Sequence, residues 1–177
     1  MTAPVINGFT LDSLRDQLQQ FGYRVELVSQ PGEEASFLRS STAGLAFDIR
    51  PGNRLADFAG GFADLAFSAW LKIEGDLPLE VVNRWNTMRR FGRLQLVPGL
   101  VVLTMDVSLV GGVMPTFVRA QVELWDHLVQ ALLPYLREEL QKLGPADGTD
   151  ALPADTKPVE QPAVVPKNAD NIVEPVA

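Results

Sequence analysis

Residues 83–112 read NRWNTMRRFGRLQLVPGLVVLTMDVSLVGG, and the apolar pattern changes from helical spacing to strict alternation within this stretch. Val81, Trp85 and Met88 lie at i, i+4 and i+7, so we expect them to share one face of a helix. Gly92 is expected to end that helix in the left-handed conformation, because glycine has no Cβ to clash there. The stretch therefore predicts a helix followed by strands.

The strands of this stretch form a predicted hairpin. From Leu100 the apolar period is two, so alternate residues over 101–109 should point to one side of a sheet. Pro98 and Gly99 are expected to form the turn between a strand at 93–97 and this one. The pair Gly111-Gly112 then predicts a sharp turn before the last helix, rather than a phosphate site, because no G-x-G-x-x-G or G-K-[ST] pattern is present.

Upstream of this stretch, the sequence predicts one helix and several strands. Thr10 is a plausible N-cap for a helix over 11–21 that Gly22 ends. Strands with alternating apolar residues are expected at 23–27, 35–40, 45–49 and 64–74, with a turn at 31–34. Trp70 lies on the polar side of the last of these strands. It indicates either a second packed face or interaction surface, or burial beneath a loop.

Downstream, the sequence predicts one long helix and a tail. An apolar stripe over 115–143 has the width that a helix covering a sheet requires. Pro134 falls inside this pattern and predicts a kink or a break, because proline cannot donate to the carbonyl of Gln130. We expect a flexible N-terminus at 1–8, an α+β domain at 9–143 and a disordered, proline- and alanine-rich acidic tail at 144–177.

Composition excludes several classes of function. The 177 residues contain no cysteine and one histidine, His127, which excludes disulfides, thiol catalysis and multi-histidine metal sites. The net charge of −7 disfavours binding to nucleic acid or to an anionic membrane. No apolar run is long enough to span a bilayer, and the first residues lack signal-peptide features, so we expect a soluble cytoplasmic protein. We expect no cofactor.

Candidate binding residues cluster around the predicted hairpin. Arg89, Arg90 and Arg93 could form an anion or partner site near Asp106, or one arginine could simply pair with that carboxylate. The amide of Asn86 could bind a peptide backbone, or it could bond the adjacent loop that ends at residues 75–78. The acidic residues are scattered rather than spaced for metal binding or acid–base work, and no nucleophile elbow is present, so we expect no catalytic residues.

The order of motifs around this stretch resembles the bacterial YbjN family, whose members are described as sensory transduction regulators. The matching motifs are NRWN at 83–86, RFGR at 90–93, MD at 105–106 and GGV at 111–113, and the resemblance covers roughly residues 11–140. It implies an α+β fold similar to type III secretion chaperones, in which helices cover a twisted antiparallel sheet in the order α-β-β-β-α-β-β-α. The proline-rich tail and Pro134 depart from the family pattern.

The resemblance implies a non-enzymatic protein, regulatory or chaperone-like, that often acts as a dimer. We therefore expect a homodimer that binds an unidentified protein partner. The residues that could take part in partner binding are Trp70, Asn86, Arg89, Arg93 and Asp106. The alternative is a small-molecule sensor whose pocket lies between sheet and helices and is lined by Phe47, Phe67 and Trp85.

Overall fold

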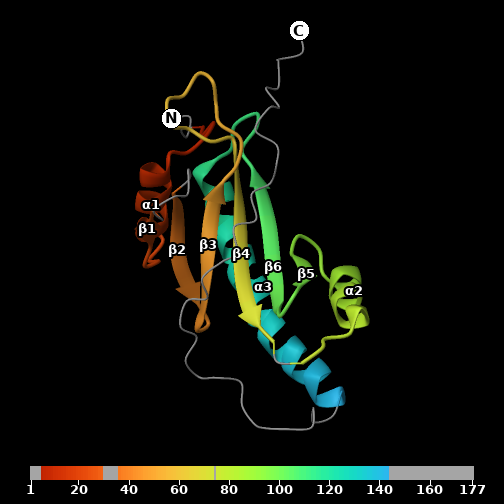
Figure 1. The fold of residues 1–177 in the computed structure, drawn as a ribbon. Coiled ribbons are helices and arrows are strands. Elements are labelled where there is room, and N and C mark those ends of the chain that lie inside the picture. The colour runs from red at the N-terminus through yellow and green to blue at the C-terminus, as the bar shows by residue number, and fades with distance from the viewer. Residues whose placement is uncertain (1–4, 30–35, 74, 144–177) are drawn as a thin grey trace.

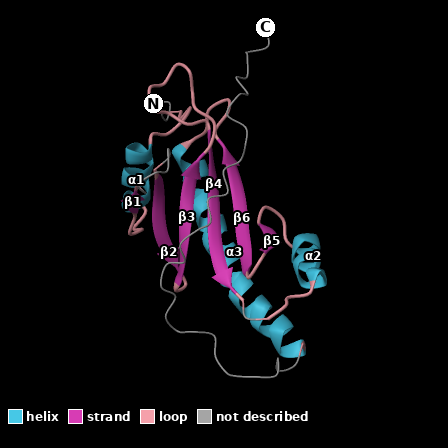
Figure 2. Cartoon of the chain, viewed as in Figure 1, coloured by secondary structure: helices cyan, strands magenta, loops and turns pink. Residues whose placement is uncertain are grey.

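A computed structural model of the chain describes residues 5–29, 36–73 and 75–143. Within them the chain forms three helices and six strands, which confirms the α+β class, and four strands rather than three precede the second helix (Figure 2). The helices are α1 (Leu11–Gln20), α2 (Leu79–Met88) and α3 (Pro115–Lys142). The strands are β1 (Glu26–Val28), β2 (Phe37–Thr42), β3 (Leu45–Pro51), β4 (Asp64–Lys72), β5 (Arg93–Val97) and β6 (Leu100–Ser108).

The six strands form one antiparallel sheet in the order β1-β2-β3-β4-β6-β5 (Figure 1). Its longest ladder joins β4 to β6, from the pair Asp64↔Ser108 to the pair Lys72↔Leu100. In the sequence, α2 and β5 lie between these two strands. β5 therefore pairs with the other side of β6 and becomes an edge strand, with the predicted Pro98-Gly99 turn connecting them.

α3 covers one face of the sheet and runs behind β4 and β6 in Figure 1. Trp125, at the centre of this helix, is fully buried and lies against Phe47 of β3 and Phe67 of β4, with ring centroids 5.6 and 5.4 Å apart. α1 joins the same core through Leu14 and Leu18. All these contacts fall on one side of the sheet, because residues at alternate positions of a strand share a face.

α2 is held against the C-terminal half of α3. The Trp85 and Tyr135 rings lie 5.3 Å apart, and the Tyr135 hydroxyl donates to the Val81 carbonyl at 2.6 Å. Arg84 donates to the Glu139 carboxylate at 2.7 and 2.9 Å, although the Glu139 side chain is only 7% exposed. A buried carboxylate needs such a partner, since desolvation otherwise favours its neutral form.

Asn86 closes the outer edge of β5. Its side-chain amide donates to the Leu94 carbonyl at 2.9 Å, and its side-chain oxygen accepts from the Leu94 N–H at 2.8 Å. These are the two hydrogen bonds that a neighbouring strand would make. The expectation that Asn86 bonds the loop ending at residues 75–78 is therefore wrong, because its amide is occupied by Leu94 of β5 instead.

The prediction for Gly92 is wrong. α2 ends at Met88, and the left-handed residue is Phe91, with φ of 70°, whereas Gly92 is not in that region. Gly92 instead has a packing role, because a Cβ there would lie 2.9 Å from a terminal methyl of Leu128. Glycine at position 92 leaves room for the Leu128 side chain of α3, and it does not end α2.

Three further predictions require correction. Met88 is 56% exposed and does not share the buried face of Val81 and Trp85, because α2 ends there. Leu27 is 44% exposed, since β1 is a three-residue edge strand. α3 continues without a break through Pro134, which is exposed on its outer side. The loss of one hydrogen bond is tolerated there because the buried side of the helix keeps its contacts on both sides of the proline.

The remaining helix signals are confirmed. The Thr10 side chain accepts from the Ser13 N–H, and Gly22 follows α1 with φ of 93°. Gly111 and Gly112 both have positive φ, as a sharp turn requires. Among the described residues, no helix combines the length and apolarity needed to cross a membrane. The turn predicted at 31–34 and the tail predicted at 144–177 lie outside the described residues.

We predict that Asn86→Ala lowers the free energy of unfolding by about 1–2 kcal/mol, because it leaves the Leu94 N–H and carbonyl without protein partners. The matched control is Asn83→Ala on the exposed side of the same helix, which should change stability by less than about 0.5 kcal/mol. Urea unfolding followed by circular dichroism measures both. Equal effects of the two substitutions would show that the Asn86 bonds do not stabilise the edge.

Candidate functional site

We call the sheet face opposite α3 the open face. Residues paired across antiparallel strands point to the same side, so the register defines this face. One row crosses the sheet from Arg39 through Asp48, Ser68 and Thr104 to Arg93. The open-face residues that concern the site are Phe37, Arg39, Asp48, Arg50, Ser68, Trp70, Arg93, Val102, Thr104 and Asp106. In Figure 1 the sheet is viewed from this side, and no labelled helix lies in front of β3, β4 or β6.

A charged cluster occupies the β2–β3 half of the open face. Arg39 donates to both oxygens of Asp48, at 2.8 and 3.2 Å, and Arg50 lies 3.8 Å from the same carboxylate. The Asp48 side chain is only 2% exposed. The hydrogen bond to Asp48 raises the pKa of the Arg39 guanidinium. Both guanidinium groups also lie over the Phe37 ring, at 5.2 and 4.2 Å from its centroid.

An aromatic and apolar patch follows on the β4–β6 half. Trp70 is half-buried and pairs across the strands with Val102, which is 3% exposed. The Trp70 Nε1 atom and the Ser68 hydroxyl are buried, and neither has a hydrogen-bond partner among the described residues. Each such group costs about 1–3 kcal/mol if it stays unpaired. A chain bound to this half of the face could supply hydrogen-bond partners for the Trp70 N–H and for the Ser68 hydroxyl.

Arg93 and Asp106 form an ion pair at the β5–β6 end of the open face. Both side chains are more than half exposed, so the pair contributes little to stability. Of the two interpretations of the arginines, the structure agrees with the one in which a single arginine pairs with Asp106. The exposed pair still presents the Arg93 guanidinium beside the Trp70–Val102 patch, three strands from Asp48 of β3.

The structure brings together three of the five residues that the sequence indicated. Trp70, Arg93 and Asp106 share the open face, whereas Asn86 is bound to β5 and Arg89 lies 5.5 Å from the Trp85 ring centroid at the end of α2. Trp70 was expected to be buried beneath a loop, but no described loop covers it.

Sequence reasoning did not select Phe37, Arg39, Asp48, Arg50 or Ser68 as site residues. The alternating pattern already placed Asp48 and Arg50 opposite the apolar side of their strand, and Ser68 beside Trp70. What was missing is the strand order, which alone places β2, β3, β4 and β6 side by side. Only then do single polar residues from separate strands form one surface.

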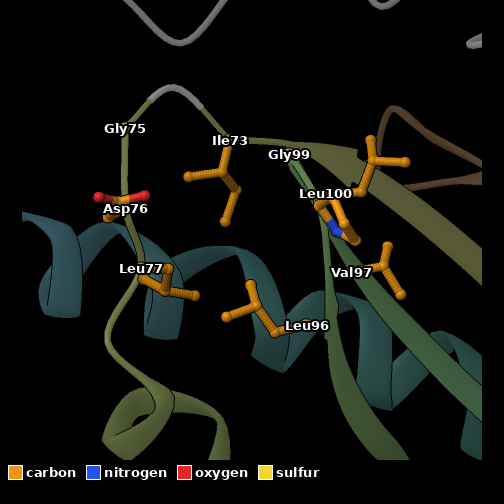
Figure 3. Close-up of a pocket in the computed structure, with 9 residues that line it drawn as sticks. Ile73, Gly75, Asp76, Leu77, Leu96, Val97, Gly99 and Leu100 are labelled. Carbon is orange, nitrogen blue, oxygen red and sulfur yellow. The ribbon is translucent and has the colours of Figure 1, made fainter.

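A separate pocket of about 300 Å³ lies beside the β5–β6 turn. Its walls include Ile73, Leu77 and Leu96, and Figure 3 shows the side chains of Leu77 and Leu96 pointing toward one another. The pocket is on the helix-covered side of the β5 edge, since Leu96 pairs with the buried Val101. Among the described residues that line it, Asp76 is the one acidic side chain, and the described part of the chain contains no group of three potential metal ligands.

The pocket expected between sheet and helices is not found where the sequence placed it. Phe47, Phe67 and Trp85 are at most 2% exposed and are in ring contact with Trp125 or Tyr135. They fill the core rather than line a cavity. The open face is therefore the larger candidate for a binding surface among the described residues.

Comparison with protein families supports the resemblance found in the sequence. Residues 10–138 match the model of the YbjN family, described as "putative bacterial sensory transduction regulator". The match covers every described helix and strand, except the last residues of α3. No curated protein matches the chain. Because the family model matches well over half of the chain, this protein belongs to the YbjN family, whose description is that of sensory transduction regulators.

Proposed function

We propose that this YbjN protein is a non-enzymatic, cytoplasmic regulator that works by binding an extended segment of another protein on the open face, in the manner of a chaperone. The observation that carries the proposal is the collection of Phe37, Trp70, Arg50 and Arg93 on a sheet face that no described helix covers. Tryptophan and arginine are the side chains most enriched where binding energy is concentrated in protein interfaces.

The sheet edges are less suitable for binding than the open face. The outer edge of β5 is closed at Leu94 by Asn86, and β1 contributes only three residues at the other edge. A partner that adds a strand would need a longer exposed edge. A segment lying across the open face could instead accept from Trp70 Nε1 through a backbone carbonyl. Carboxylates beside it could bind the exposed Arg93.

A regulatory small molecule has less support. The aromatic residues that would have lined its pocket fill the core, and the described residues around the pocket beside β5 include one acidic side chain and no basic one. Nucleic acid is disfavoured by the net charge of −7.

We predict that the tagged full-length protein captures one stoichiometric partner from the cytoplasm of its source cell and that Trp70→Ala abolishes the capture. Arg93→Glu should weaken it, because a carboxylate replaces a cation that faces the partner. The control is Arg137→Glu on the exposed side of α3, which makes the same charge change away from the open face and should leave the capture intact.

Each variant must melt within a few degrees of the parent for the comparison to count. Capture that survives both open-face substitutions would place the partner elsewhere on the molecule. The absence of any partner would turn attention to the pocket beside β5 and a small-molecule signal.

We also propose that the protein is a homodimer. Much of the apolar surplus of α3 packs on the core. Val110 in the turn before α3, Met114 at its N-cap and Phe117 in its first turn remain 76, 42 and 37% exposed. A second copy could bury these side chains, since an exposed apolar cluster is typical of an association surface.

Light scattering coupled to size exclusion is expected to give twice the chain mass of 19.4 kDa at tens of micromolar protein. Phe117→Glu should shift the protein to monomer, because it places a charge in the buried contact. A strict monomer for the parent protein would contradict the dimer, and a dimer unaffected by Phe117→Glu would place its interface elsewhere.

A further inference from the structure

The connection between α2 and β5, residues 89–92, contains a strained residue that the fold does not require. Phe91 has a φ of 70°, and the Gly92 N–H donates to the Arg90 carbonyl at 2.8 Å, so the connection is a γ-turn of the strained kind. Ala43, the other described non-glycine residue with positive φ, lies in the two-residue turn of the β2–β3 hairpin, where that geometry is normal. The residues around Phe91 form no such hairpin.

The surrounding structure holds this turn from both sides. The Arg89 N–H donates to the Trp85 carbonyl at 2.8 Å, and the Trp85 Nε1 donates to the Gly92 carbonyl at 3.2 Å. Gly92 is packed against Leu128 of α3. The Phe91 side chain adds little to this, because it is 63% exposed and is not among the side chains that pack on the core. A glycine at position 91 would adopt the same backbone without strain, so the aromatic side chain indicates a use outside the fold.

The same turn gathers positive charge on a chain that is negative overall. Residues 83–105 contain four arginines and no acidic residue, whereas the whole chain has a net charge of −7. Two of these arginines are paired with carboxylates, but Arg89 and Arg90 form no ion pair within the described part of the chain. The Arg90 guanidinium lies 5.3 Å from the centroid of the Phe91 ring, so the turn presents a cation and an aromatic ring together.

We propose that residues 89–92 bind an acidic segment of the partner protein, with an apolar side chain of that segment packed on Phe91. This inference rests on the proposed function, and it names the chemistry of the partner. Carboxylates form bidentate hydrogen bonds with guanidinium groups such as those of Arg89 and Arg90. Arginine and large aromatic side chains are also the residues on which interface energy is concentrated.

The turn continues the open face at its β5 end, as the connection from α2 to β5 in Figure 1 shows. Phe91 lies two residues before Arg93, which pairs with Thr104 of β6, and Trp70 pairs with Val102 of the same strand. The backbones of Trp70 and Arg93 are therefore about 12 Å apart, two strands across and two residues along. One extended segment of roughly six residues can reach from Trp70 to Phe91.

A short acidic segment fits this turn better than a large polyanion does. At physiological salt, charges separated by more than about 8 Å are largely screened, so a segment that contacts only the turn responds to Arg89 and Arg90. A lipid bilayer or a nucleic acid would lie against a wider part of a molecule whose net charge is −7, and that charge opposes binding.

Peptide selection tests this chemistry directly. Random peptides of about 12 residues, which reach about 40 Å when extended, would be displayed and selected on the immobilised full-length protein. We expect the enriched peptides to share several acidic residues next to an apolar residue. The most enriched peptide, labelled with fluorescein, then serves as the probe for binding measured by fluorescence anisotropy, and its affinity should fall as salt rises.

Charge reversal in the turn should weaken binding of this probe. Arg89→Glu/Arg90→Glu is expected to raise the dissociation constant by about tenfold or more, and the neutral Arg89→Gln/Arg90→Gln by less. The matched control is Arg24→Glu/Arg137→Glu, which makes the same charge change at two exposed positions outside the turn. It should alter the dissociation constant by less than about twofold.

Phe91→Gly separates a binding role of this side chain from a structural one. The glycine relieves the backbone strain, so we expect the melting temperature to rise while the dissociation constant of the probe increases by about fivefold or more. A melting temperature that falls together with the affinity would show that Phe91 is structural and would overturn the proposal.

Other results would also overturn it: enriched peptides without acidic residues, no enriched sequence at all, or unchanged probe binding after charge reversal in the turn. Co-sedimentation of the native protein with mixed phosphatidylcholine and phosphatidylglycerol vesicles, abolished by Phe91→Gly, would assign the turn to a membrane instead. Trp70→Ala tests the proposed function separately. Probe binding lost only in Trp70→Ala would leave the open face standing without the turn, and probe binding lost only in the turn variants would contradict the open face.

Discussion

The packing of Trp125 against Phe47 and Phe67 sets the architecture on which everything else depends. An indole between two rings from adjacent strands places α3 on one face of the sheet, and each aromatic side chain removes a large apolar area from water. Gly92 lets the helix approach the backbone closely beside Leu128. Since α1 packs on the same side, the described helical layer is one-sided, and no described helix covers the second face of the sheet.

That asymmetry explains the unusual chemistry of the open face. The solvent-facing side of an antiparallel sheet normally carries polar residues. The open face instead contains the buried side chains of Phe37 and Val102 together with the buried Asp48 carboxylate. Asp48 is tolerated there because Arg39 donates two hydrogen bonds to it, so neither charge is buried alone. Such pairs seldom add net stability but strongly penalise the loss of one partner. The face therefore combines a fixed charged cluster with an apolar patch, as a surface for a specific extended segment requires.

The sequence predicted the elements better than their assembly. Alternation at 100–108 and helical spacing at 115–143 each depend on one face of one element, so both could be recognised from local patterns. Gly92 was misassigned because its constraint comes from Leu128, far away in the sequence, and glycine gives the same local signal for a helix end and for a close approach. Trp70, Arg93 and Asp106 were recognised as unusual, but their grouping with Phe37 and Asp48 required the strand order. That order depends on β6, not β5, pairing with β4, which no local pattern encodes.

The most direct test of the open face as the interaction surface is chemical-shift mapping. Backbone and indole resonances of the isotope-labelled protein would be followed by nuclear magnetic resonance while its captured partner is added. The account predicts that the largest changes fall on open-face positions of β2, β3, β4 and β6, with the Trp70 indole N–H among them. Changes concentrated on α3, on the outer edge of β5 or around the pocket at Leu77 and Leu96 would contradict it.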